Sequence, residues 1–137
     1  MRRQILTLAM ILLLIGSAMV PRVADAESPG WVCVDDTWGG IACASPEISE
    51  AIFSAADYYD VDVWWHMRTA ACESSFDPNT VGAMGEIGLF QWFVDWPYEG
   101  EFYEYGSGSP WDVWDASYAA ANAFSQGHWW RFVCASR

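Results

Sequence analysis

Hydrophobic residues recur at the three- and four-residue spacing of an amphipathic helix directly after Ser45. Ser45 can cap a helix, and Pro46 suits the first helical position because its missing N–H would have no partner there. The spacing predicts a helix over residues 46–59. Its apolar face consists of Ile48, Ala51, Ile52, Ala55 and Tyr59.

A second stretch with helical spacing follows Asp62, which is another suitable cap. Pro78 prevents this helix from continuing, because proline cannot adopt the interior geometry of a helix. The pattern therefore places Glu73 in the last turn of a second helix. The apolar and small residues that set the spacing are Val63, Met67, Ala70 and Ser74, with Trp64 and Ala71 beside them.

Two irregular stretches precede the last predicted helix. Residues 76–92 mix three glycines with apolar residues, which predicts a tight turn or a small hairpin. Residues 93–112 form an acidic, aromatic loop that serves either as a mobile lid or as a packed cover. Residues 115–126 are rich in alanine and predict a final helix that Gly127 can terminate.

The N-terminal end has the pattern of a secretory signal peptide. Arg2 and Arg3 precede an apolar run over residues 5–15, and Ala24 and Ala26 provide an Ala-x-Ala cleavage site. The run is shorter than the roughly 20 residues that span a bilayer. We therefore expect residues 1–26 to be removed and the protein to be secreted to the cell wall or periplasm, with 27–45 as a stapled N-terminal arm without periodicity.

Charge narrows the range of partners. The chain has 18 acidic residues against six arginines and no lysine, for a formal net charge of −12. Cleavage after Ala26 removes one acidic and three basic residues, which leaves 17 against 3 and a net charge near −14. Such a surface repels phosphate backbones and anionic lipids. We expect no nucleic-acid partner, no membrane partner after cleavage, and a monomer with a neutral or cationic ligand.

Four cysteines, an even number in an exported chain, indicate two disulfides. Three pairings are open. We favour Cys33–Cys43 as a small loop and Cys72–Cys134 as the bond that ties the C-terminus to the core, because closing the longer loop removes about 4 to 5 kcal/mol of unfolded-chain entropy.

Metal sites are disfavoured. The sequence lacks a Cys-x-x-Cys pair, and its two histidines are unpaired in sequence, so a zinc site is not expected. Asp57, Asp60 and Asp62 lack the glycine turn and terminal glutamate of a calcium-binding loop. We expect neither a metal nor a cofactor.

Glu73 is the first candidate for chemistry. At a helix C-terminus its carboxylate faces the negative end of the helix dipole, and shielding by Phe76, Met84 or Leu89 would disfavour the anion further. We expect Glu73 to keep its proton near neutral pH, with Glu86 across the turn as a second carboxylate. A protonated acid beside an ionised carboxylate is the pair that cleaves glycosidic bonds. The alternative is that both residues merely belong to the acidic surface.

The segments Glu73 to Pro78 and Gly85 to Gln91 resemble the lysozyme-like superfamily, and most closely the soluble lytic transglycosylase (SLT) domain. That family has Glu-Ser-x-Phe-Asn/Asp-Pro followed closely by Gly-x-x-Gly-Leu-Met/Phe-Gln, and both occur here in order and at the family's spacing. Tyr58 to Asp62 resembles the entry to the glutamate helix, with Asp60 in place of glycine. Cys72 to Ser74 and Trp130 to Cys134 resemble resuscitation-promoting factor domains, which also support a Cys72–Cys134 bond.

The resemblance implies a mainly α, lysozyme-like (α+β) domain over residues 46–137, with a short β-hairpin or turn region beside the active-site cleft. It implies cleavage of peptidoglycan strands at the β-1,4 bond between N-acetylmuramic acid and N-acetylglucosamine. Glu73 would be the general acid and then base, Ser74 would support it, and Gln91 and the backbone around Gly88 would line sugar subsites. Aromatic faces bind sugar C–H surfaces, and the first candidates for the groove are Trp92, Trp96 and Trp111. For each single tryptophan the alternative, a place in the core, is favoured, because large apolar side chains dominate small cores.

The type of reaction stays open. Transglycosylases commonly carry serine where Gly82 stands and a small residue where Glu86 stands. Chicken-type lysozymes place their second catalytic carboxylate where Glu86 falls, which favours hydrolysis. A hypothesis from another class is a non-catalytic wall-binding module on the same fold. The acidic charge gives that hypothesis weight, because bacterial walls are anionic and repel an acidic enzyme.

Overall fold

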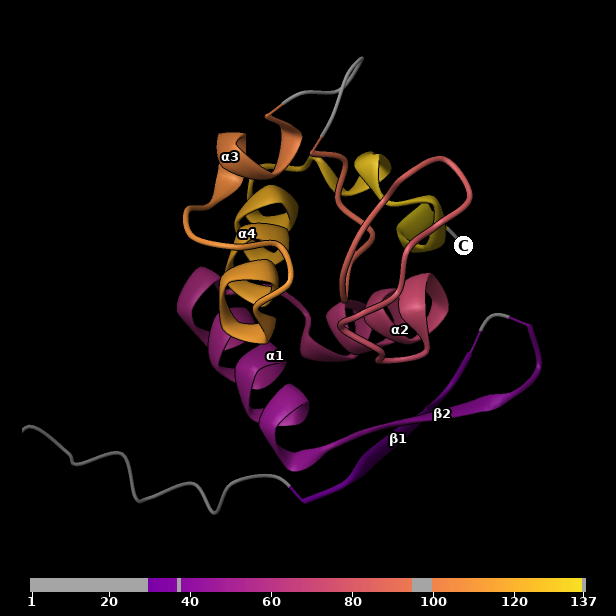
Figure 1. Ribbon diagram of the computed structural model, residues 1–137. Helices are drawn as coiled ribbons and strands as arrows, with labels where there is room; N and C mark the ends of the chain where they lie inside the picture. The colour runs from indigo at the N-terminus through magenta and orange to yellow at the C-terminus, as the bar shows by residue number, and fades with distance from the viewer. Residues whose placement is uncertain (1–29, 37, 95–99, 137) are drawn as a thin grey trace, which may run out of the picture.

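The computed structural model describes residues 30–36, 38–94 and 100–136. The expected signal peptide, 1–26, and the candidate Trp96 lie outside the described residues. Within them the chain forms a small, mainly helical domain with one two-stranded antiparallel hairpin (Figure 1). The elements in order are β1 (Val32–Asp35), β2 (Ile41–Ala44), α1 (Pro46–Tyr59), α2 (Val63–Ser74), α3 (Glu101–Tyr105), α4 (Val113–Ser125) and two short 3₁₀ turns, η1 (Trp129–Arg131) and η2 (Val133–Ser136).

The first helix has the predicted bounds. Its N-terminus is capped by Ser45, whose Oγ accepts a hydrogen bond from the backbone N–H of Ile48 at 3.4 Å. Its C-terminus ends at Asp60, which adopts a left-handed conformation with φ of 53°. Glycine adopts this conformation most easily and aspartate tolerates it, which explains how Asp60 can stand where the resembling family has glycine.

The second helix is also confirmed. Asp62 Oδ1 accepts from the backbone N–H of Trp65 at 2.7 Å and caps its start. Ser75 is left-handed, with φ of 54°, and its N–H returns to the carbonyl of Ala71. The helix therefore ends at Ser74, and Glu73 lies in its last turn as expected.

Two predictions from the second half of the chain need correction. Helix α4 begins at Val113 rather than at residue 115, because Asp112 Oδ1 caps it by accepting from the N–H groups of Trp114 and Asp115. The expected loop over 93–112 contains the five-residue helix α3. Phe102 and Tyr105 are buried, so this part of the stretch is a packed cover and not a lid.

Strands β1 and β2 form a β-hairpin where an arm without periodicity was expected. Strands β1 and β2 pair antiparallel, and Cys33 lies directly opposite Cys43. These two cysteines form one disulfide, with Cα atoms 4.0 Å apart, and Cys72–Cys134 forms the other, with Cα atoms 5.8 Å apart. The favoured pairing is confirmed. Two disulfides are compatible with an extracellular location.

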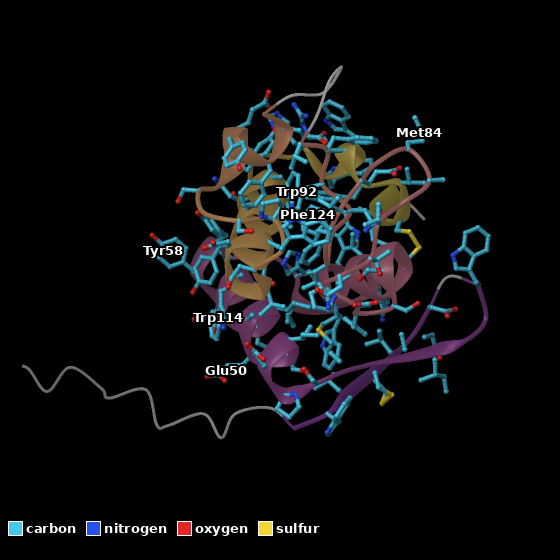
Figure 2. The ribbon with its side chains drawn as sticks, in the orientation of Figure 1. Glu50, Tyr58, Met84, Trp92, Trp114 and Phe124 are labelled. Carbon is cyan, nitrogen blue, oxygen red and sulfur yellow. A yellow bond between two sulfur atoms is a disulfide. The ribbon has the colours of Figure 1, made fainter. Side chains whose placement is uncertain are left out.

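The helices surround one hydrophobic core. Helix α1 packs most extensively against α4, and strands β1 and β2 pack against α1 and α2 (Figure 1). The core is filled largely by aromatic side chains and alanines, and Trp92 and Phe124 lie in the middle of the molecule (Figure 2). None of the helices in the described part of the chain is long and apolar enough to cross a membrane.

Candidate active site

Glu73 lies where the end of α2 meets the C-terminal segment of the chain. Its side chain is half-buried, and its Oε1 accepts a hydrogen bond from the backbone N–H of Cys134 at 3.0 Å. Cys134 is bonded to Cys72, the residue before Glu73. The carboxyl is thus held in place from both sides by parts of the chain that the disulfide joins.

A pocket opens at this carboxyl. Two acidic side chains, Glu73 and Glu86, share it, so the structure brings together the two predicted carboxylates. Apolar residues and one arginine supply most of the remaining wall. The full lining consists of Glu73, Glu86, Phe90, Gln91, Phe93, Arg131, Phe132 and Val133.

The side chains that shield Glu73 differ from those expected. Met84 is 73% exposed at the tip of the turn, at the edge of the molecule (Figure 2), and Phe76 and Leu89 belong to the buried core. The apolar wall of the pocket comes instead from Phe90 and Phe93 and, at the C-terminal end of the chain, from Phe132 and Val133 beside Arg131. The sequence signal for this C-terminal wall was the favoured Cys72–Cys134 bond, which joins the residue before Glu73 to the end of this segment although 58 positions separate Glu73 from Arg131.

The environment raises the pKa of Glu73 above the usual value of a glutamate. Burial is the largest cause, because it removes water from the charged form. The N–H of Cys134 opposes this by stabilising the anion, and the negative charge of Glu86 raises the pKa further. The direction agrees with the prediction that Glu73 holds its proton to higher pH.

Glu86 is fixed by the turn that precedes it. Its Oε2 accepts from the backbone N–H of Met84 at 2.9 Å. Gly82 lies against this carboxylate, and a Cβ atom at position 82 would collide with Glu86 Oε2 and would meet Gln91 Oε1 at 2.6 Å. The absence of a side chain at Gly82 therefore makes room for the glutamate at position 86. The two residues that depart from the transglycosylase pattern are direct neighbours here.

Ser74 and Gly88 hold the turn in place and do not face a ligand. Ser74 is buried, and its hydroxyl donates to the carbonyls of Leu89 at 2.9 Å and Ala70 at 3.2 Å. Gly88 is buried with φ of 78°, and a Cβ there would collide with the carbonyl oxygen of Pro110. These bonds tie the end of α2 to the turn, which fits the supporting role expected for Ser74, and its buried hydroxyl is already used within the protein.

Gln91 reaches the pocket as predicted. It adopts φ of 51°, and its Nε2 donates to the carbonyls of Gly88 at 2.9 Å and Thr80 at 3.2 Å. These bonds fix the side chain from two sides of the turn. The side-chain Oε1 of Gln91 and the carboxylate of Glu86 both lie against Gly82.

The tryptophan candidates are not confirmed as groove residues. Trp92 is 1% exposed and packs against Phe102 and Phe132 in the core, so it cannot stack on a sugar. Trp111 is 43% exposed but does not line the pocket of Glu73. The reason is general, because large apolar side chains fill small cores first.

Arg131 is a pocket residue that sequence reasoning missed. Its guanidinium donates to Glu101 Oε1 at 2.8 Å and to Glu104 Oε2 at 2.7 Å, which joins α3 to the pocket wall. It also lies over the rings of Tyr105 and Trp130, at 5.1 and 5.2 Å. Two signals could have singled it out, namely the rarity of basic residues in this acidic chain and the favoured Cys72–Cys134 bond, which brings the residues before Cys134 close to Glu73.

No set of three or more His, Cys, Asp or Glu side chains in the described ranges is arranged to hold a metal ion. The pocket places two carboxyl groups, Glu73 and Glu86, among partly apolar walls. Comparison with models of known protein families, with curated proteins and with solved structures gives no match to this chain.

Proposed function

We propose that this protein is a secreted enzyme with a lysozyme-like fold that cleaves the β-1,4 bond between N-acetylmuramic acid and N-acetylglucosamine in peptidoglycan. The single observation that carries the proposal is the half-buried Glu73, whose pKa is raised and which shares a pocket with Glu86. The motif resemblance around these two residues supports the choice of substrate. The two disulfides support export, because such bonds persist in oxidising compartments.

Glu73 would act first as a general acid. In its protonated form it gives a proton to the glycosidic oxygen, and the bond to the departing sugar breaks as an oxocarbenium-like centre develops. The carboxylate that remains is the species that the Cys134 N–H stabilises, at 3.0 Å. The same group can then accept a proton from the incoming nucleophile, so one residue serves both halves of the reaction.

Glu86 would support the positive centre as an anion. Its fixed position, with Oε2 held by the Met84 N–H, favours a role in which the carboxylate does not have to move. With Glu86 present we favour hydrolysis, in which water attacks. In the transglycosylase alternative, the 6-hydroxyl of the muramic acid attacks and leaves a 1,6-anhydro end.

The second candidate function is a peptidoglycan-binding module without turnover. One observation favours it, namely the net charge of −12, which repels an anionic wall and slows encounter with it. Such a module would need the pocket to bind the glycan, but it would not need Glu73 or Glu86 to be in a particular protonation state.

The test is mass spectrometry of sacculi digested with the wild-type protein and with Glu73→Gln. The glutamine can keep the acceptor for the Cys134 N–H but has no proton to give. We expect reducing muramic ends from the wild type, or anhydro ends in the transglycosylase case, and neither from a folded Glu73→Gln variant. Equal products from both proteins would refute the assignment of Glu73 as the proton donor. If the wild type gives no products, the peptidoglycan-binding module is the candidate function that remains.

The role of Glu86 is tested separately with Glu86→Gln. If Glu86 is a catalytic carboxylate, turnover falls by orders of magnitude while the unfolding midpoint stays close to that of the wild type. A variant with nearly unchanged turnover would place Glu86 among the ordinary acidic residues of the surface.

A further inference from the structure

Both cysteines of the Cys72–Cys134 disulfide are directly connected to Glu73, the candidate proton donor. Cys72 directly precedes Glu73 in α2, and the backbone N–H of Cys134 donates to Glu73 Oε1 at 3.0 Å. The bond joins residues 62 positions apart in sequence. It therefore fixes both the helix end that carries the carboxyl and the backbone donor that holds it.

The segment that ends in Cys134 also closes the pocket. Arg131, Phe132 and Val133 line it together with the turn residues Phe90 and Gln91. Phe132 is buried and packs on Phe90, so the first part of this segment is anchored in the core.

The part beyond Phe132 forms the short turn η2, which packs against α2. The contacts that hold it include the disulfide, the bond from the Cys134 N–H to Glu73, the buried side chain of Ala135, and the bond from Trp65 Nε1 to the carbonyl of Ala135 at 3.0 Å. A single hydrogen bond is a weaker attachment than a disulfide that closes a long loop, so the disulfide is the strongest of these.

We propose that the Cys72–Cys134 disulfide positions the Glu73 carboxyl and makes the site sensitive to reduction. The disulfide keeps η2 against α2, which keeps water away from Glu73 and keeps the Cys134 N–H in reach of its carboxylate. The part of this inference that concerns reaction rate rests on the proposed function, and the part that concerns the environment of Glu73 does not.

The sign of the effect follows from the two opposing influences on Glu73 that η2 controls; the third, the charge of Glu86, comes from the turn and raises the pKa in both states. Without the disulfide, η2 can leave, so water enters and the N–H of Cys134 is lost. Water favours the anion and lowers the pKa, while loss of the N–H raises it. Burial is the larger of the two influences in the native site. The net result is a lower pKa, so the acid form of Glu73 is lost at lower pH.

Reduction requires a dithiol as the electron donor. The dithiol supplies two electrons and two protons, the S–S bond breaks, Cys72 and Cys134 become thiols, and the reductant becomes a cyclic disulfide. Oxidation restores the bond, so the effect is reversible if the domain stays folded.

The chain offers a matched control in its other disulfide. Cys33 and Cys43 join β1 to β2, are exposed, and are absent from the lining of the Glu73 pocket given above. The test compares Cys72→Ala/Cys134→Ala with Cys33→Ala/Cys43→Ala. The readouts are the NMR titration of the Glu73 side-chain carboxyl, labelled with ¹³C, and the pH dependence of wall lysis.

We expect the Glu73 titration to move to lower pH in Cys72→Ala/Cys134→Ala and to stay in place in the control. The alkaline limb of the pH–rate profile should move with it, and the rate on that limb should fall about tenfold for each pH unit by which the Glu73 midpoint moves. In the Cys33→Ala/Cys43→Ala background, where Cys72–Cys134 is the remaining bond, dithiothreitol should produce the same change in midpoint and reoxidation should reverse it.

Because unfolding also exposes Glu73, the titration is read from species with native amide signals. If the alanine variant does not fold, Cys72→Val/Cys134→Ala, which fills part of the lost volume, provides the second test. An unchanged Glu73 titration in a folded variant without the bond would overturn the proposal, as would equal changes in both double variants. Since the NMR measurement needs no turnover, its failure is distinct from a failure of the proposed function.

Discussion

From the burial of His66 we expect the folded protein to lose stability steeply in mild acid. The side chain is fully buried, stacked on Phe90 and edge-on to Phe124, with Nε2 3.2 Å from the carbonyl of Ser117. Burial lowers its pKa from 6.5 to about 3, against an opposing effect of the Ser117 carbonyl. The folded state therefore keeps the imidazole neutral at a pH where the unfolded chain binds a proton.

The sign and size follow from proton linkage. A folded-state pKa below the unfolded value gives stability that is present above pH 6.5 and is lost as pH falls towards 3. Below pH 6.5 the slope is about 1.4 kcal/mol per pH unit, so His66 alone costs about 2 kcal/mol between pH 7.5 and pH 5. The full range to pH 3 corresponds to about 5 kcal/mol, a large part of the stability of a small domain.

The assay is urea unfolding of the wild type and of His66→Gln from about pH 7.5 to about pH 5. Glutamine keeps a donor for the Ser117 carbonyl but does not titrate, so the difference between the two proteins isolates His66. We expect the wild type to lose about 2 kcal/mol relative to the variant over this range. NMR adds a direct readout, with His128→Gln used to assign the remaining imidazole signal. Two results would refute the reasoning. One is a difference in unfolding free energy between the two proteins that stays constant with pH, and the other is a His66 imidazole that titrates near 6.5 in the folded protein.

Three further substitutions test the site. Because the pKa of Glu73 is raised in the folded state, its contribution to stability is present below pH about 4 and is lost as pH rises through the folded pKa. Urea unfolding should therefore show that Glu73→Gln gains stability relative to the wild type over that rise. The gain is at most about 1.4 kcal/mol for each pH unit by which the pKa is raised. Gly82→Ala should push the Glu86 carboxylate away from the Met84 N–H and reduce lysis towards the Glu86→Gln level, with about 0.5 kcal/mol or less change in stability because the carboxylate can move towards solvent. Unchanged lysis would show that the position of Glu86 does not matter. Gly88→Ala should destabilise the fold by at least about 1 to 2 kcal/mol in the same assay, because its φ of 78° is unfavourable for alanine and the added methyl meets the Pro110 carbonyl.

Local signals made the main helices predictable. Ser45, Pro46 and Asp62 identify helix starts by the chemistry of their side chains, and the structure uses each of them in that way. The short helix α3 had no such signal. It has no side-chain cap, and it forms because Phe102 and Tyr105 find space in the core, which only the tertiary structure provides.

The site was predictable in part for the same reason. Glu73, Glu86 and Gln91 belong to two neighbouring segments, and local spacing was sufficient to bring them together. The wall formed by Arg131 and its neighbours depends on a contact between distant parts of the chain. Trp92 lies in the core, which was the favoured place for any single tryptophan, because its sequence neighbours do not show which aromatic side chains reach the surface.

The most direct test of the central claim is the NMR titration of the Glu73 carboxyl in the folded wild-type protein. We predict a midpoint above the ordinary value of a glutamate, coincident with the alkaline limb of wall lysis. A midpoint at or below the ordinary value would contradict the claim, because Glu73 would then be ionised at the pH where it has to supply a proton.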